Sequence, residues 1–321
     1  QHEKRLLFLF DLITRKVVKE YTLEESTNQF RAPRYDIAFS PDGRCLAVLS
    51  KVPNQVLIYN TLDGKLLWST PTSLLRYNWL AFSGDGKRLL AAAHHVQPET
   101  PCRTIPFVST CQVWDVSDRK LLFEKKFEYY STSWTINRDG THLAASLRSP
   151  EKSYLSIMEL ESSGRELFKK EIPYKHLIAL TFSPDGKSLA AVNFTHERNK
   201  LVIWNAHSGE FIWEQESVPA STHIAFTKDG KRILHVGYSG NVAMHDFATG
   251  QEVLNFPHHG KPRFGDYALT PRVVFNRDET MMISHGWDGN ISIRHAFPAS
   301  EYNKHPNKYE KISKVRPNAQ E

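Results

Sequence analysis

The sequence predicts an all-β fold assembled from one repeated unit of four antiparallel strands, and three observations support this prediction. The chain has 321 residues, and a five-residue turn that reads FSPDG at Phe39–Gly43 recurs along it in variant forms. Successive copies lie 43 to 54 residues apart, a period typical of propellers and solenoids. Apolar and polar residues alternate around every copy, and no stretch of ten or more residues has a helical pattern.

Each copy of the turn joins two short apolar segments. The turn recurs unchanged at Phe182–Gly186, and a last variant, Phe275–Glu279, has Glu in place of Gly. Asp-Gly between apolar strands is a strong hairpin signal, because Gly tolerates a positive φ and Asp can bond its own turn backbone. We therefore interpret the turn residues as structural: Asp42, Gly43, Asp85, Gly86, Asp139, Gly140, Asp185, Gly186, Asp229 and Gly230.

A second hairpin follows the first in each unit. Residues 201–217, LVIWNAHSGEFIWEQES, show the plan: a strand of β-branched and aromatic residues, a turn containing Gly, and a second strand that ends in charged residues. Each period therefore encodes four antiparallel strands, and such units repeated around a ring are the blades of a β-propeller.

The number of blades follows from counting hairpins. Residues 6–23 read as an outer hairpin with no inner hairpin before it, so the chain has six inner and seven outer hairpins. We expect seven blades with an incomplete first blade over residues 1–29, and six blades is the alternative. The predicted propeller is a single domain over residues 1–315, with a last outer strand near Lys308–Val315 and a disordered tail at 316–321.

These units resemble WD40 repeats. The FSPDG turn supports the resemblance, and so does the dipeptide that ends the third strand, although only Trp114–Asp115 is the literal Trp-Asp. The last unit, HGWDGNISIRH, places Asp288 where the family has its buried Asp, but the Gly-His that opens a family unit is missing throughout. The family's His–Asp network is therefore not carried over. The other dipeptides are Phe10–Asp11, Tyr59–Asn60, Met158–Glu159, Trp204–Asn205, His245–Asp246 and Arg294–His295.

The resemblance covers almost the whole chain and implies a propeller fold. Divergent units with long insertions look most like the bacterial WD40-like type, which is often one domain of a longer protein. TolB-like and lactonase-like propellers use similar turns, so a periplasmic accessory protein and a hydrolase are alternatives implied by likeness.

Composition places few limits on the compartment. The formal net charge is +6, and no run of 18 apolar residues predicts a membrane span. Cys45 lies in an alternating segment and is expected to be a small buried residue. Cys102 and Cys111 flank one loop, and they would pair in an oxidising compartment or stay as free thiols. A cytoplasmic location is favoured, and a periplasmic or secreted one follows if the two are bonded.

No set of residues in the sequence points to catalysis. The Asp residues of the turns are separated by whole blades, whereas a metal site or a carboxylate pair needs groups that converge. Two His pairs, His94–His95 and His258–His259, are adjacent in sequence, so their side chains would point to opposite faces of a strand. The chain has no G-x-S-x-G motif and no glycine-rich phosphate loop. We predict no catalytic residue, metal or cofactor, with a lactonase-like hydrolase as the alternative.

The segments that lead into the first strand of each blade suggest a partner-binding surface. In a propeller these connections gather at one mouth of the central channel, and most of them combine an aromatic residue with Lys or Arg. Aromatic residues and Arg are enriched at binding hot spots. The alternative is that several of the aromatics wedge between blades. The residues are Arg34, Tyr35, Arg76, Tyr77, Trp79, Tyr130, Tyr174, Lys175, Arg263, Phe264 and Tyr267.

The insertion His94–Thr110 belongs to the same face, and it contains Phe107 and other apolar residues that a solvated loop does not need. It either contacts a partner or packs on its own blade. We therefore expect a non-catalytic scaffold that binds another protein, for which an acidic peptide segment would suit a basic surface. A nucleic acid or another polyanion is the alternative partner. The protein is expected to be monomeric or one domain of a longer chain.

Overall fold

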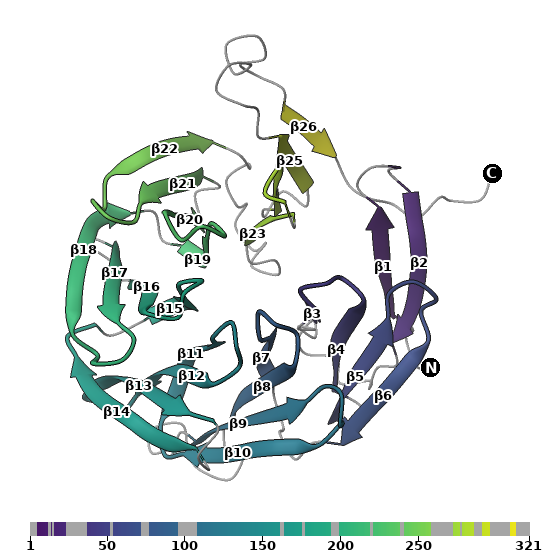
Figure 1. Ribbon diagram of the computed structural model, residues 1–321, viewed down its shortest axis with the longest axis horizontal. Coiled ribbons are helices and arrows are strands. Elements are labelled where there is room, and N and C mark those ends of the chain that lie inside the picture. The colour runs from purple at the N-terminus through teal and green to yellow at the C-terminus, as the bar shows by residue number, and fades with distance from the viewer. Residues whose placement is uncertain are drawn as a thin grey trace. The chain divides into compact units, whose positions relative to one another are not determined.

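The computed structural model describes residues 5–11, 14, 16–23, 37–51, 54–71, 77–95, 108–160, 164–174, 177–193, 199–218, 221–237, 241–257, 272–276, 278–285, 291–295 and 309–312. Within them, the regular secondary structure consists of antiparallel strands (Figure 1). The chain forms two compact units. Unit 1 comprises Gln1–Ser131, Asp139–His142 and Glu159–Arg165, and unit 2 comprises Thr132–Arg138, Leu143–Met158 and Glu166–Glu321.

Unit 1 contains one two-stranded hairpin and two four-stranded sheets. The hairpin is β1 (Arg5–Asp11) and β2 (Lys16–Leu23). The first sheet is β3 (Ile37–Phe39), β4 (Cys45–Lys51), β5 (Asn54–Asn60) and β6 (Leu66–Pro71). The second is β7 (Tyr77–Phe82), β8 (Arg88–His95), β9 (Val108–Asp115) and β10 (Leu121–Phe127).

Unit 2 contains three complete sheets and most of a fourth. The fourth sheet is β11 (Tyr130–Ile136), β12 (His142–Arg148), β13 (Ser153–Glu159) and β14 (Arg165–Ile172), whose end residues belong to unit 1. The first complete sheet is β15 (Leu177–Phe182), β16 (Ser188–Asn193), β17 (Asn199–Asn205) and β18 (Phe211–Val218). The second is β19 (Ser221–Phe226), β20 (Arg232–Gly237), β21 (Asn241–Asp246) and β22 (Glu252–Pro257). The third is β23 (Arg272–Phe275), β24 (Met281–His285), β25 (Ile291–His295) and β26 (Tyr309–Ile312).

The described residues thus form six four-stranded antiparallel sheets and one two-stranded hairpin. The predicted blade of four antiparallel strands is confirmed, and six sheets match the alternative count of six. The strand β26 lies inside the range expected for the last outer strand. The interpretation of β1–β2 as an incomplete first blade, and of residues 1–315 as one domain, stays a prediction.

Each five-residue turn links the first and second strands of its sheet. In the β3–β4 turn, Asp42 Oδ1 accepts hydrogen bonds from the Ser40 hydroxyl at 2.6 Å and the Arg44 amide at 3.0 Å. The Gly43 amide donates to the Ser40 carbonyl at 2.8 Å. Gly43 has a φ of 72°, in the left-handed region that favours glycine. The Asp carboxylate is therefore bound within its own turn, where it holds the hairpin closed.

The turn between the third and fourth strands depends on the second residue of the WD-like dipeptide. Asn205 Oδ1 accepts the amides of His207 at 2.9 Å and Ser208 at 3.0 Å. Asp115 Oδ1 accepts the amide of Asp118 at 2.9 Å in the same way. A carboxylate and a side-chain amide both present an acceptor oxygen, so the position works with Asp or Asn. The need for an acceptor explains why the sequence departs from Trp-Asp without losing the turn.

The core of each unit lies along the second and third strands. Every residue of β16 is buried, including Ala190 and Ala191 with no exposed surface. A strand covered on both faces reads as a continuous apolar run instead of an alternating one. In unit 2 the first strands β15, β19 and β23 contact one another in order, and Figure 1 shows β15 and β19 as neighbours.

Successive sheets are joined by a repeated contact between a ring and a glycine. The ring of Phe168, on β14, lies 2.6 Å from where a Cβ on Gly209 would stand, and Gly209 is in the β17–β18 turn. Trp213 of β18 covers Gly250 of the β21–β22 turn in the same manner, and Phe123 covers Gly164 in unit 1. All three glycines have a positive φ. An aromatic residue near the start of an outer strand therefore packs on a glycine in a turn of the next sheet.

Candidate interaction surface

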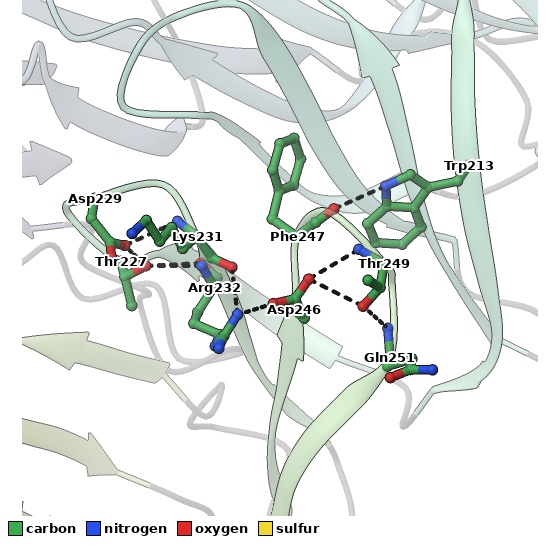
Figure 2. Close-up of polar contacts among 9 residues, drawn as sticks. All are labelled: Trp213, Thr227, Asp229, Lys231, Arg232, Asp246, Phe247, Thr249 and Gln251. Carbon is green, nitrogen blue, oxygen red and sulfur yellow. Dashed lines mark hydrogen bonds and ion pairs between the residues drawn. The ribbon is translucent and has the colours of Figure 1, made fainter. Parts of the chain in front are cut away.

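The turn end of the sheet β19–β22 has a continuous polar network (Figure 2). Asp229 Oδ1 accepts the Thr227 hydroxyl at 2.7 Å and the Lys231 amide at 2.9 Å. The Arg232 amide donates back to the Thr227 hydroxyl at 3.0 Å. The amide of Lys231, followed by the hydroxyl of Thr227, holds the pKa of Asp229 below its usual value. This carboxylate is therefore ionised and fixed at neutral pH.

Asp246 joins the two turns of that sheet. Its carboxylate forms an ion pair with the Arg232 guanidinium, and it also accepts the Thr249 amide at 3.0 Å. The Thr249 amide is the main reason that the pKa of Asp246 lies below its usual value, and Arg232 adds to the effect. The Thr249 hydroxyl in turn accepts the Gln251 amide at 3.3 Å. As Figure 2 shows, these contacts hold the two turns of one sheet together.

Trp213 connects this network to the preceding sheet of unit 2. Its indole Nε1 donates to the Phe247 carbonyl at 3.1 Å. The Phe247 ring packs edge-on against Phe226, with ring centroids 5.5 Å apart. The indole therefore serves both as a packing group over Gly250 and as a hydrogen-bond donor.

An open pocket of about 400 Å³ lies between the turns of unit 2. Its two lining carboxylates, Asp185 and Asp229, belong to five-residue turns. Burial opposes ionisation of Asp185, but the Ser183 hydroxyl at 2.6 Å and the Lys187 amide at 3.1 Å hold its pKa below the usual value. Since the pKa of both carboxylates is lowered, neither is suited to act as a general acid at neutral pH. The lining residues are Arg138, Ser183, Pro184, Asp185, Lys228, Asp229, Gly230 and Phe247.

A second polar cluster lies at the opposite end of the strands of unit 2. Tyr174, in the connection between β14 and β15, donates its hydroxyl to Glu214 Oε2 at 2.6 Å. Lys200 Nζ lies 2.6 Å from Glu214 Oε1 and 3.0 Å from Glu216 Oε1. Burial and the hydrogen bond to Glu214 raise the pKa of Tyr174. Burial opposes ionisation of Glu214, but Lys200 and Tyr174 together lower its pKa.

A chain of buried histidines crosses the sheet β19–β22. Ser221 Oγ lies 2.7 Å from His235 Nδ1, and His235 Nε2 lies 2.9 Å from His245 Nε2. His245 Nδ1 lies 3.2 Å from the Gly250 carbonyl, which can only accept, so this nitrogen donates. If His235 Nε2 donates to His245 Nε2, the Nδ1 of a neutral His235 is left to accept from the Ser221 hydroxyl. Burial, with a smaller contribution from His245, lowers the pKa of His235 to about 3.

The sequence interpretation placed His245 in a dipeptide but missed this chain. The signal was present in the segments RILHVG and NVAMHD, where His stands in otherwise apolar strands. Which atoms meet depends on the register, which pairs His235 with Ala243 and His245 with Ile233. The repeat period of the sequence does not by itself predict this strand register.

Comparisons with known proteins place the fold. No family model matches the sequence, and a comparison with curated proteins finds no match. Among solved structures, a chain of "Crystal Structure of Mitotic Checkpoint Complex" is similar with a TM-score of 0.70 at 14% identity, covering 92% of this chain and 82% of that one. The β-propeller domain of Myceliophteria thermophila Cps50 (Swd1) is similar with a TM-score of 0.62 at 16% identity, covering 84% and 86%. The fold of this chain is a β-propeller.

A third similar structure is Kuenenia stuttgartiensis hydrazine synthase, with a TM-score of 0.66 at 15% identity over 91% of this chain and 89% of that one. Identities this low establish the fold and nothing about the site. Within the described part of the propeller, no three His, Cys, Asp or Glu side chains are grouped so that they could hold a metal ion. None of the described elements is a helix long and apolar enough to cross a membrane.

The predicted partner-binding residues whose side chains the structure describes are wholly or partly buried. Tyr174 is buried with 8% of its surface exposed, packed edge-on at 5.8 Å from Trp204. Its position matches the alternative that aromatics wedge between blades. Trp79 on β7 and Tyr130 at the start of β11 are half-buried, and the strand at Tyr77 is described without its side chain. The other predicted residues lie outside the described ones: Arg34, Tyr35, Arg76, Phe107, Lys175, Arg263, Phe264 and Tyr267.

The remaining Cys and His predictions have mixed outcomes. Cys111 is buried on β9, and burial raises the pKa of its thiol. Cys45 is half-buried instead of fully buried, because it begins β4 beside the β3–β4 turn. Cys102 and the pair His258–His259 lie outside the described residues, so the disulfide stays a prediction. His94 and His95 end β8, and their side chains are not described.

Proposed function

We propose that this propeller is a non-catalytic scaffold that binds another protein through the end of its blades that carries the connections into β3, β7, β11, β15, β19 and β23. The supporting observation is that Trp79, in β7, and Tyr130, at the start of β11, keep part of their surface exposed. Partly exposed aromatic residues on a rigid frame offer contact area at a low entropic cost.

The charges at the connection end and at the turn end of the blades support binding at the connection end. At the turn end, the described Asp carboxylates are already bound by hydroxyl and amide donors of their own turns. The sequence combines aromatic residues with Lys and Arg at the connection end, and the chain has a net charge of +6. A partner segment that carries Asp or Glu would therefore be favoured there.

A propeller enzyme is the alternative function. It requires an acid or base with a suitable pKa in a pocket. In the pocket of unit 2, Asp185 and Asp229 are both held ionised by their own turns, which disfavours a general acid there.

The proposal is tested by capturing partners from a source lysate at two salt concentrations with two charge-reversal variants. The first variant changes Arg34, Arg76, Lys175 and Arg263 to Glu at the connection end. The control changes the exposed turn-end residues Arg44, Lys87, Lys187 and Lys231 to Glu, so both variants alter the net charge equally. Circular dichroism and thermal melting verify that both variants are folded.

The proposal expects one partner that the wild type captures, that salt weakens, and that only the connection-end variant loses. Equal capture by both variants would remove the basic surface as the site and leave the insertion His94–Thr110 as the next region to test. If the wild type captures no protein, the scaffold proposal fails, and assays for small-molecule binding and hydrolysis follow.

A further inference from the structure

Three consecutive five-residue turns build the pocket of about 400 Å³ at the turn end of unit 2. Arg138 comes from the β11–β12 turn, Asp185 from the β15–β16 turn and Asp229 from the β19–β20 turn. Neighbouring turns are in contact, since Pro184 Cδ lies 3.6 Å from where a Cβ on Gly230 would stand. The walls of the pocket are therefore set by the packing of successive sheets.

Four charged side chains line this pocket, two of each sign. The charged groups of Arg138 and Lys228 form no ion pair with another residue that the structure describes. Asp185 and Asp229 each use Oδ1 within their own turn, and their Oδ2 atoms make no hydrogen bond to another described residue. A ligand that is complementary to this pocket therefore carries one positive and one negative group.

Phe247 gives the pocket an apolar wall. Its ring is half-buried, with its centroid 5.5 Å from that of Phe226 and 6.4 Å from that of Trp213. The Phe247 carbonyl also accepts the Trp213 indole at 3.1 Å (Figure 2). Because the ring is already held by these contacts, it loses little conformational freedom when a ligand packs on its remaining surface.

The next sheet holds the backbone of the pocket at Lys228. The carboxylate of Glu279, in the β23–β24 turn, accepts the Lys228 amide. Glu279 has a φ of 58°, at the turn position where Gly186 and Gly230 have φ of 71°. A residue other than glycine is strained in this region, and such strain is typical of places where the structure supports a site.

We propose that this pocket binds a small zwitterion of the amino-acid class, with an apolar side chain against Phe247. The ligand carboxylate accepts hydrogen bonds from the two cations, and the ligand ammonium donates to the Oδ2 atoms of Asp185 and Asp229. The volume suits such a ligand, because small-molecule sites begin at about 300 Å³. This site lies at the turn end, so it goes beyond the scaffold function proposed for the connection end.

A set of small probes separates the parts of the ligand. Isothermal titration calorimetry with the complete 321-residue protein should show saturable binding of L-phenylalanine or L-leucine. N-acetyl-L-phenylalanine lacks the ammonium group, L-phenylalanine amide lacks the carboxylate, and glycine lacks the apolar side chain. Each of these three should bind about tenfold more weakly, since one hydrogen bond to a charged group contributes about that much to affinity.

Three variants assign the binding to the pocket. Arg138→Met and Lys228→Met each remove one cation, and Asp229→Asn removes a charge but keeps an acceptor oxygen for the turn. Lys187→Met is the matched control, because Lys187 is an exposed cation of the β15–β16 turn that does not line the pocket. We expect about tenfold weaker binding for each pocket variant and a change below about twofold for the control. Circular dichroism and Tm verify that all four are folded.

Absence of saturable binding for both L-phenylalanine and L-leucine would overturn the proposal. Equal binding of the N-acetylated probe or of the amide would also overturn it, because the ligand would then need only one charge. A loss in Lys187→Met as large as in Lys228→Met would place the binding elsewhere. The connection-end charge variant should bind L-phenylalanine like the wild type, and Lys228→Met should still capture the protein partner, so the two proposals fail independently.

Discussion

The ring of Phe168 packs directly against Gly209 of the next sheet in unit 2, at a position where a Cβ would stand 2.6 Å from the ring. This contact requires two properties of glycine at once, because Gly209 also has a φ of 67°. The same arrangement recurs at Trp213 and Gly250. Because the same contact recurs between successive sheets, the regularly spaced sequence repeats pack against one another in a regular way.

Substitution of Gly209 by Ala tests both requirements at this position, the positive φ and the absence of a Cβ beside the Phe168 ring. A Cβ at positive φ costs about 1–2 kcal/mol of folding free energy, and the clash with Phe168 adds about 1–3 kcal/mol. Gly43→Ala is the matched control, since its φ is 72° and no atom lies within 4 Å of the added Cβ. Urea unfolding should show the larger loss for Gly209→Ala. Equal losses for the two variants would mean that the ring contact contributes nothing.

The buried histidines predict loss of stability in mild acid. The folded state depresses the pKa of His235 from 6.5 to about 3, so between these values the folded protein binds fewer protons than the unfolded one. The contribution of His235 is therefore complete above pH 6.5, and it falls by about 1.4 kcal/mol per pH unit as the pH drops below that value. Gln at position 235 cannot titrate. His235→Gln should be less stable at pH 7 but should show a shallower decline from pH 6.5 to 4.5 in urea unfolding. A decline as steep as that of the wild type would contradict this role.

The acceptor oxygen of Asn205 predicts the outcome of a conservative exchange. Asn205→Asp keeps the oxygen that binds the amides of His207 and Ser208, so stability should change little. Asn205→Ala removes both bonds and should cost about 1–2 kcal/mol. Thermal unfolding of the two variants provides the measurement. A loss for Asp as large as that for Ala would show that the amide group itself is required.

Tyr174 offers a test of whether a predicted surface residue is structural. Tyr174→Phe keeps the packing on Trp204 but removes the hydrogen bond to Glu214, which should cost about 1–2 kcal/mol of stability. Because the side chain is buried, capture of a partner should be unchanged at a temperature well below the Tm. Loss of capture by a folded Tyr174→Phe protein would place this residue in the binding surface after all.

The repeat made the fold predictable, but only part of the site. Asp-Gly turns such as Asp42–Gly43 act locally, so a single sequence reveals the hairpins and the all-β class. The burial of Tyr174 depends on the packing of two sheets against each other, and the approach of His235 to His245 depends on strand register. Neither property appears in the period of the sequence. The hairpin count favoured seven blades because residues 6–23 resemble an outer half, and the described residues form six four-stranded sheets and one two-stranded hairpin.

The central claim is that the connection end of the blades binds the partner. Hydrogen exchange measured by mass spectrometry, with and without the captured partner, tests it most directly. We expect slower exchange on binding in peptides covering residues 24–36, 72–80 and 258–271, and unchanged exchange in the turn-end peptides covering 183–188 and 227–232. Slower exchange confined to the turn-end peptides would contradict the claim and place the partner at the pocket lined by Asp185 and Asp229.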